Sequence, residues 1–223
     1  MDKLLEVMRQ FRFEGDYVEY EVVNSGNINQ TYCVTYRDAG RIHKYTLQKL
    51  NTNVFKKPVE VMENILAVTE HLKIKTAEQY GSYDRHVLSV VHTVDDKPYL
   101  DSPELGFWRA FVYVDGARGY DSVEKPEHFY MAGKAFGEFQ QFLADFPAQT
   151  LYETIPNFHN TPARLDTFRK AVEEDRAGRA HLVQDEIRFI LARAEKASAI
   201  MRRIDAGRSP CALRITTPSS TTS

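Results

Sequence analysis

The chain has 223 residues, of which 43% are hydrophobic, and its formal net charge at pH 7 is -2. This length suits one large domain or two small lobes, with a sizeable buried core. The small net charge excludes a strongly basic protein, so we expect neither nucleic acid nor an anionic membrane surface as a partner.

The sequence also lacks the signals of export and membrane insertion. Charged residues stand in its first turn, and no apolar run approaches the roughly 20 residues that span a bilayer. These features predict a soluble, cytoplasmic protein with no membrane partner. The two cysteines, Cys33 and Cys211, are far apart and lack the spacing of a metal site. We interpret both as plain thiols, in neither a disulfide framework nor a zinc site.

Three strand-like segments lie between residues 17 and 50: YVEYEVV, TYCVTY and HKYTLQKL. The polar segments NSGNINQ and RDAGR separate them, a pattern typical of three antiparallel strands. Pro58 then starts a helix of about four turns. Its apolar face is predicted from residues that recur every three or four positions: Met62, Ile65, Leu66, Thr69 and Leu72.

Further strands are predicted in RHVLSVVHTV and KPYLD, which form a hairpin at residues 95 and 96. GFWRAFVYV supplies another strand, which ends near residue 115. Residues 1–116 are therefore expected to form an antiparallel sheet of about five strands with one helix.

After residue 116 the strand signal stops and helical spacing begins. Pro126 begins a helix that Pro147 ends, and a second helix is predicted over residues 183–204. The predicted fold class is therefore α+β with two lobes, a sheet-rich lobe at 1–116 and a helical lobe at 117–216.

The loop between the first two strands is suited to holding phosphate. It contains Gly26, Asn27, Ile28, Asn29 and Thr31. Its glycine permits close backbone approach, and its Asn and Thr residues leave backbone N–H groups for phosphate oxygens. It has no P-loop lysine, and an ordinary hairpin loop is the alternative interpretation.

Lys49 is a candidate for contact with an anion. It shares its side of the third strand with Tyr45 and Leu47, so a cation stands on an otherwise apolar face. Glu63 or Glu60 on the next helix could supply a counter-charge, an arrangement that holds nucleotide phosphates in kinase-type folds. The alternative is a lysine at the strand edge that extends into water.

Four segments resemble the aminoglycoside-phosphotransferase-like kinases, in particular the N-acetylhexosamine 1-kinase branch: GNINQTY, YTLQKLNTNVFKKPVEVMENI, FWRAFVYVDGA and AFGEFQQFLADFPAQTLYETIPNFHNTPAR. The resemblance runs from about Gly26 to Thr216. It implies a two-lobed protein-kinase-like fold, with an antiparallel-sheet amino lobe and an incomplete helical carboxyl lobe. It also implies transfer of the γ-phosphoryl group of ATP, with magnesium, to a hydroxyl of an amino sugar or other sugar.

The resemblance implies a role for each nucleotide-binding candidate. The loop 26–31 covers the triphosphate, Lys49 contacts it, and Glu63 orients Lys49. The backbone from Val112 to Val114 meets the adenine, since an extended backbone offers a donor and an acceptor side by side.

His159 and Asn160 are the candidates that the resemblance implies for contact with sugar hydroxyls. Both lie in a polar loop of the helical lobe. The alternative for this pair is a capped helix start before Pro162.

The catalytic loop and metal motif of this kinase family are missing from the sequence. In the family, a segment like LRIT runs into His-Asn-Asp and then Lys-Leu-Asn-Asn-Val, whereas here it runs into TPSSTTS. We therefore assign no catalytic residue and no magnesium ligand. One codon choice for PSSTTS encodes Lys-Leu-Asn-Asn-Val when read two bases further on. We hypothesise a frameshift after Thr216 and expect a disordered tail at 217–223, a natural Ser/Thr-rich tail being the alternative.

The predicted function is therefore a kinase-like chain that binds nucleotide weakly and is inactive alone. Apolar faces of the helices after Pro126 and Val183 are expected to be exposed. The alternative is a non-catalytic nucleotide- or ligand-binding module. A structural partner protein that uses the helix at 183–204 is a third hypothesis.

Overall fold

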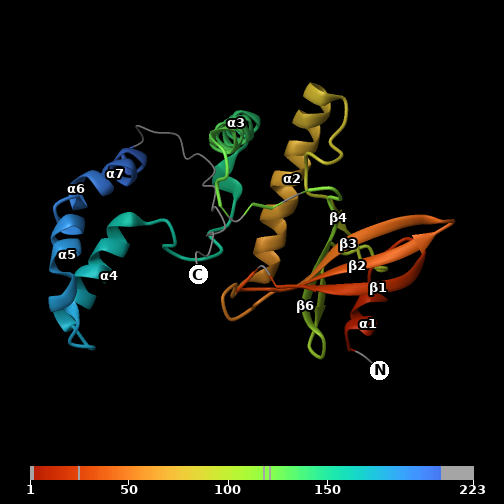
Figure 1. Ribbon diagram of the computed structural model, residues 1–223, viewed down its shortest axis with the longest axis horizontal. Coiled ribbons are helices and arrows are strands. Elements are labelled where there is room, and N and C mark those ends of the chain that lie inside the picture. The colour runs from red at the N-terminus through yellow and green to blue at the C-terminus, as the bar shows by residue number, and fades with distance from the viewer. Residues whose placement is uncertain (1–2, 25, 118, 121, 207–223) are drawn as a thin grey trace. The chain divides into compact units, whose positions relative to one another are not determined.

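The structure is a computed structural model that describes residues 3–24, 26–117, 119–120 and 122–206 (Figure 1). The chain divides into two compact units, the first at Met1–Thr154 and the second at Ile155–Ala212. The expected lobe boundary at 116/117 falls inside the first unit. Cys211, the LRIT segment and the tail at 217–223 lie outside the described residues.

A mixed, antiparallel-sheet fold of the α+β class is confirmed for the first unit. Its described residues form a sheet of six strands, where the sequence predicted about five, in the order β1-β2-β3-β6-β4 with β5 beside β6. All the pairings are antiparallel. The strands are β1 (Asp16–Val23), β2 (Gln30–Asp38), β3 (Arg41–Lys49), β4 (Val90–Val91), β5 (Leu100–Ser102) and β6 (Gly106–Val112).

Helix α1 (Lys3–Met8), which the sequence analysis did not predict, packs on one face of the sheet (Figure 1). Its buried side chains are Leu4, Val7 and Met8. Burying them against the sheet removes apolar surface from water, which stabilises the short helix. The sheet residues in the same cluster include Val34, Tyr36, Tyr45, Leu47, Trp108 and Ala110. We call this side of the sheet the α1 face.

Helix α2 (Pro58–Tyr80) packs on the other face. Met62 is fully buried in a cluster with Leu50 and Phe107. Phe107 and Trp108 are neighbours on β6, so they point to opposite faces, and Trp108 belongs to the α1 cluster. The helix is longer than the four turns predicted, because it continues to Gly81, whose left-handed backbone ends it.

Helix α3 (Pro126–Phe142) belongs to the first unit because the segment that ends it packs against α2. Leu143 is buried with Leu72 of α2, and the Lys75 ammonium lies 2.5 Å from the Asp145 carboxylate. A 3-10 turn, η1 (Ala148–Thr150), follows.

Several large apolar side chains of the helices are exposed, as predicted. Phe129 and Tyr130 of α3 are 69% and 72% exposed, and Ile200 in the second unit is 71% exposed. The expectation of exposed apolar helix faces after Pro126 and after Val183 is therefore confirmed.

The second unit is helical, but the single helix predicted over residues 183–204 is wrong. Arg193 has φ -105° and ψ 1°, outside the helical region, and it interrupts the helix before Ala194. The Ser198 hydroxyl donates to the Ala194 carbonyl at 3.0 Å. Serine side chains that bond backbone carbonyls in this way compete with regular helix. The elements are α4 (Thr161–Glu174), η2 (Ala180–Val183), α5 (Gln184–Leu191), α6 (Ala194–Ala197) and α7 (Ala199–Asp205).

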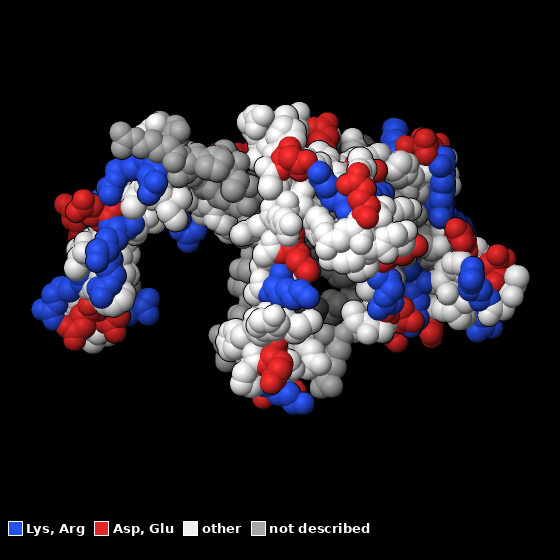
Figure 2. Space-filling model, turned by 90° about the horizontal axis from the view of Figure 1, so that it is seen from above, with Lys and Arg blue, Asp and Glu red and all other residues white. Residues whose placement is uncertain are grey.

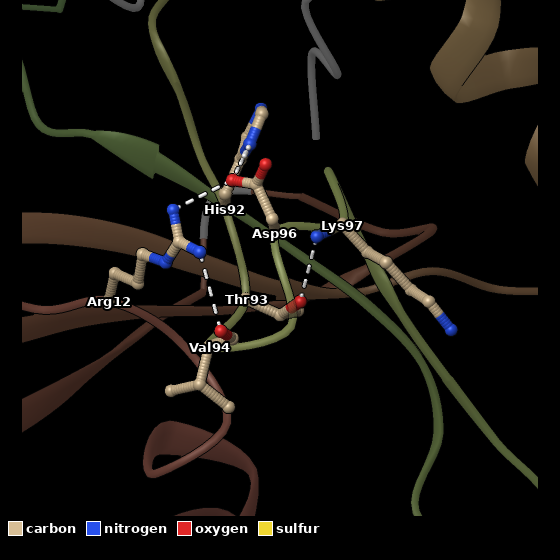
Figure 3. Close-up of polar contacts among 6 residues, drawn as sticks. All are labelled: Arg12, His92, Thr93, Val94, Asp96 and Lys97. Atoms are coloured by element: carbon tan, nitrogen blue, oxygen red, sulfur yellow. Dashed lines mark hydrogen bonds and ion pairs between the residues drawn. The ribbon is translucent and has the colours of Figure 1, made fainter.

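A turn is present at residues 95 and 96 as predicted, but β4 and β5 do not form a hairpin, because each pairs with β6 and not with the other. The turn is held by polar contacts (Figure 3). The Arg12 guanidinium donates to the Asp96 carboxylate at 2.7 Å and to the Val94 carbonyl at 3.3 Å. A hydrogen bond with His92, together with the charge of Arg12, holds the pKa of Asp96 below its ordinary value. These contacts attach the segment after α1 to the turn at residues 93–97.

Charged side chains of both signs are interspersed on the face that Figure 2 shows, rather than gathered into one patch of one sign. Within the described ranges, none of the helices combines the length and the apolar character that crossing a membrane requires.

Tyr36 gives the first unit a predictable loss of stability at alkaline pH. Burial, and to a lesser degree the nearby Tyr17 and Tyr45, raises the pKa of Tyr36 to about 12. The unfolded chain ionises this group from about pH 10, so its contribution to stability is complete below pH 10 and is lost as the pH rises towards 12. We expect the free energy of unfolding to fall by about 1.4 kcal/mol per pH unit more in the wild type than in Tyr36→Phe. Urea unfolding between pH 9 and 11.5 measures the difference, and parallel pH profiles would contradict it.

Candidate functional site

The sheet face on the α2 side carries a row of polar residues at its centre. Directly opposed residues of antiparallel strands point to the same face. Thr31 of β2 opposes Gln48 of β3, and Gln48 opposes Arg109 of β6. Cys33 and Thr46 oppose one another two residues further along these strands, on the same face. We call these five residues the polar face, and all five are partly exposed.

A chain of hydrogen bonds crosses the polar face from β6 to β2. The Arg109 Nε–H donates to the Gln48 side-chain carbonyl at 3.1 Å. The Gln48 side-chain N–H donates to the Thr31 hydroxyl oxygen at 3.0 Å. Gln48 is therefore held from both sides, and it fixes the orientation of the guanidinium.

Arg109 is a largely buried cation without a matching anion. Burial lowers the pKa of Arg109 to about 10, so the side chain stays charged at neutral pH. No ion pair joins it to a carboxylate anywhere in the described ranges. Its guanidinium also lies 5.3 Å from the centroid of the Phe111 ring.

The far end of the polar face is bordered by charged residues. The Lys44 ammonium lies 3.8 Å from the Asp115 carboxylate and 6.0 Å from the centroid of the Tyr113 ring. Burial raises the pKa of the Cys33 thiol, an effect that the charge of Lys44 opposes. Lys44 and Asp115 thus stand where β6 ends and the segment of Val112 to Val114 begins.

Lys49 lies on the α1 face, away from the polar face. It shares this side of β3 with Tyr45 and Leu47, as the sequence predicted. Its ammonium lies 5.7 Å from the centroid of the Trp108 ring, a cation–π contact with a residue of the α1 cluster. Because α2 packs on the opposite face of the sheet, the side chain of Lys49 points away from this helix.

Glu63 of α2 is not brought to Lys49. Its carboxylate accepts a hydrogen bond from the Tyr152 hydroxyl. The negative charge of Glu63, and to a lesser degree this hydrogen bond, raise the pKa of Tyr152. The side chain of the neighbouring Asn64 makes two hydrogen bonds with the backbone of Tyr152. Its N–H donates to the Tyr152 carbonyl, and its oxygen accepts the Tyr152 N–H, each at 2.9 Å. Glu60 pairs instead with Lys57 at 2.8 Å. The expected pairing of Lys49 with a glutamate of this helix is therefore absent from the described structure.

The loop 26–31 is exposed at its tip and anchored at its end. Gly26, Asn27 and Ile28 are exposed, and a Cβ built on Gly26 would meet nothing within 4 Å. The Asn29 side-chain oxygen accepts the Asn51 backbone N–H at 3.0 Å. The loop is thus attached where β3 ends, beside the Thr31 and Gln48 end of the polar face.

The backbone predicted to meet adenine is partly committed to the sheet. The Val112 N–H donates to the Ser89 carbonyl at 2.9 Å, and the Tyr113 N–H donates to the Lys44 carbonyl at 3.0 Å. The backbone N–H and carbonyl of Val114 bond to no other described residue. Val114 is therefore the position in this segment with both a donor and an acceptor open.

His159 and Asn160 lie in the second unit, at the start of α4. The Asn160 side-chain oxygen accepts the Ala163 N–H at 3.1 Å, so Asn160 is the N-cap of α4, with Pro162 in the first turn. The capped helix start that the sequence left as an alternative is therefore present. His159 lines a pocket of about 470 Å³ with Arg164 and Phe168. Its Nε2 atom is buried and has no hydrogen-bond partner among the described residues.

Sequence reasoning missed Gln48 and Arg109. The available signal was a polar residue inside each of two apolar strands, TLQKL and FWRAFV. Without the pairing of β3 with β6, nothing showed that the two side chains meet. No protein-family model matches the chain.

Proposed function

We propose that the first unit binds a nucleoside triphosphate, as the nucleotide-binding part of a small-molecule kinase of the aminoglycoside-phosphotransferase type. The observation that carries the proposal is the open backbone of Val114 at one end of a half-buried polar sheet face. An unbonded N–H and carbonyl on one residue match the acceptor and donor edge of adenine. The order of elements, with α2 after β3, is consistent with the resemblance.

The spacing along β3 supports this proposal. The Lys44 carbonyl accepts the N–H of Tyr113, the residue before Val114. Lys44 and Gln48 are four residues apart on β3. In a β-strand this separation is about 13 Å, comparable with the length of an extended nucleoside triphosphate. The adenine would lie near Val114, and the phosphates would extend towards Gln48 and the loop 26–31.

The transfer step itself is assigned to no described residue. Magnesium is expected from the resemblance, but the described ranges hold no cluster of three or more His, Cys, Asp or Glu side chains suited to a metal ion. We therefore assign no magnesium ligands and derive no step through the ion. The proposal for this chain is nucleotide binding without turnover.

The resemblance also implies a sugar as the acceptor of the phosphoryl group, and we propose that it binds in the pocket in the second unit. The unpartnered Nε2 of His159 supports contact with a sugar hydroxyl, since a buried imidazole nitrogen lacks a hydrogen bond there. Asn160 is committed to capping α4 through its oxygen. His159 is therefore the better supported of the two candidates.

Calorimetric titration with ATP and with ITP, each with magnesium, tests the nucleotide proposal. Hypoxanthine reverses the donor and acceptor on the edge that Val114 would meet, while the ribose and phosphates are unchanged. We expect one ATP site per chain and binding of ITP that is weaker by roughly ten-fold or more. Absence of ATP binding, or equal affinity for ITP, would overturn the adenine contact. Phosphorylation of an amino sugar by the purified chain would contradict binding without turnover.

A further inference from the structure

Arg109 is the feature of the molecule that its own contacts explain least. A buried charge is costly unless an opposite charge or several hydrogen bonds compensate for it. Within the described ranges, the Arg109 guanidinium donates one hydrogen bond, to the neutral Gln48 side chain, and it pairs with no carboxylate. An anionic ligand would supply the opposite charge that the described residues do not provide.

The hydrogen bonding of Arg109 leaves the outer part of its guanidinium available. Gln48 accepts from Nε, and no bond joins either Nη group to another described residue. The two Nη groups carry four N–H donors in a plane, which suits the oxygens of a phosphate group in a two-pronged contact. Thr31, at the other end of the same hydrogen-bond chain, lies beside the loop 26–31.

Lys49 is not positioned for this task. Its ammonium lies over Trp108 on the α1 face, whereas Arg109 is on the α2 side of the sheet, opposed to Gln48. The two cations therefore lie on opposite faces of the sheet.

We infer that Arg109 binds the phosphate groups of the nucleotide, with Gln48 as the residue that positions its guanidinium. The inference rests on the proposed function and names the cation of that site. It replaces the role that the resemblance implied for Lys49.

The test measures the affinity of the full chain for three probes: ATP, adenosine and inorganic tripolyphosphate. In Arg109→Met, affinity for ATP and for tripolyphosphate is expected to fall by roughly ten- to a hundred-fold, while affinity for adenosine stays within two-fold. Lys49→Met is the matched control, because it removes a cation from the same part of the sheet on the opposite face. Its affinities for all three probes are expected to stay within two-fold of the wild type.

Gln48→Glu tests the positioning role separately. A carboxylate at this position would pair with Arg109 and compete with phosphate, so affinity for tripolyphosphate is expected to fall while adenosine binding is kept. The Nε–H resonance of Arg109 is expected to move on Gln48→Glu, which a merely structural role of Gln48 elsewhere in the sheet would not produce. An unchanged resonance and unchanged tripolyphosphate affinity would overturn the role of Gln48.

The outcomes separate this inference from the proposed function. Unchanged tripolyphosphate affinity in Arg109→Met would overturn the inference, even if the wild type binds ATP. Tripolyphosphate binding that needs Arg109, in a protein that binds no adenosine, would support the phosphate contact and contradict the adenine contact. If Arg109→Met fails to fold, the Nε–H resonance of Arg109 in the wild type decides. It must move on addition of tripolyphosphate, and an unmoved signal overturns the inference.

Discussion

Replacing Gly15 by alanine is expected to destabilise the first unit by about 3–5 kcal/mol, the sum of a backbone cost and a steric cost. Gly15 has φ +89°, a conformation that residues with a Cβ rarely adopt. A Cβ built on it would lie 2.4 Å from the Arg37 carbonyl oxygen and 2.8 Å from the Asp38 nitrogen. These are backbone atoms of β2, so no flexible side chain can move aside, and the pairing of β1 with β2 has to shift.

Gly40 is the matched control for this substitution. Its φ is +83°, but a Cβ built on it would meet nothing within 4 Å. Gly40→Ala is therefore expected to cost about 1–2 kcal/mol, the backbone cost alone. Urea unfolding followed by circular dichroism measures both variants. Equal losses of stability in the two would show that the close approach of Gly15 to β2 is wrong.

Replacing Leu47 by alanine is expected to cost about 2–5 kcal/mol of unfolding free energy. Leu47 is fully buried on the α1 face, in the cluster that α1 completes. Its truncation removes apolar contacts and leaves a cavity between α1 and the sheet, which close-packed neighbours fill only in part.

Ile42 provides a control on the same strand, because it is 46% exposed. Ile42→Ala is expected to cost about 1 kcal/mol or less, mainly through the lower strand propensity of alanine. Thermal and urea unfolding of the two variants give the comparison. A loss in Leu47→Ala as small as that in Ile42→Ala would contradict the packing of α1 on this face.

Local patterns were sufficient to predict most elements of the sheet. The alternation in YVEYEVV, TYCVTY and HKYTLQKL predicted β1, β2 and β3, since each strand has one face against the core. Helix α1 was missed because six residues are too few for a periodic signal, although Leu4, Val7 and Met8 have helical spacing. The break between α5 and α6 was missed because apolar spacing continues through it.

The site shows where local patterns are insufficient. The alternation of side chains along a strand correctly predicted that Lys49 lies on the same face of the sheet as Tyr45 and Leu47. It could not indicate which face α2 would cover, since that depends on packing between residues distant in the sequence. For the same reason the approach of Gln48 to Arg109, which are 61 residues apart, could not be predicted from either strand alone.

The side of the sheet that receives the nucleotide is tested most directly by following the amide and side-chain resonances of the protein during addition of ATP. We predict the largest changes at Thr31, Gln48, Arg109 and Val114, with the indole N–H of Trp108 on the α1 face unchanged. Changes concentrated around Trp108, or no saturable change at the polar face, would contradict the account.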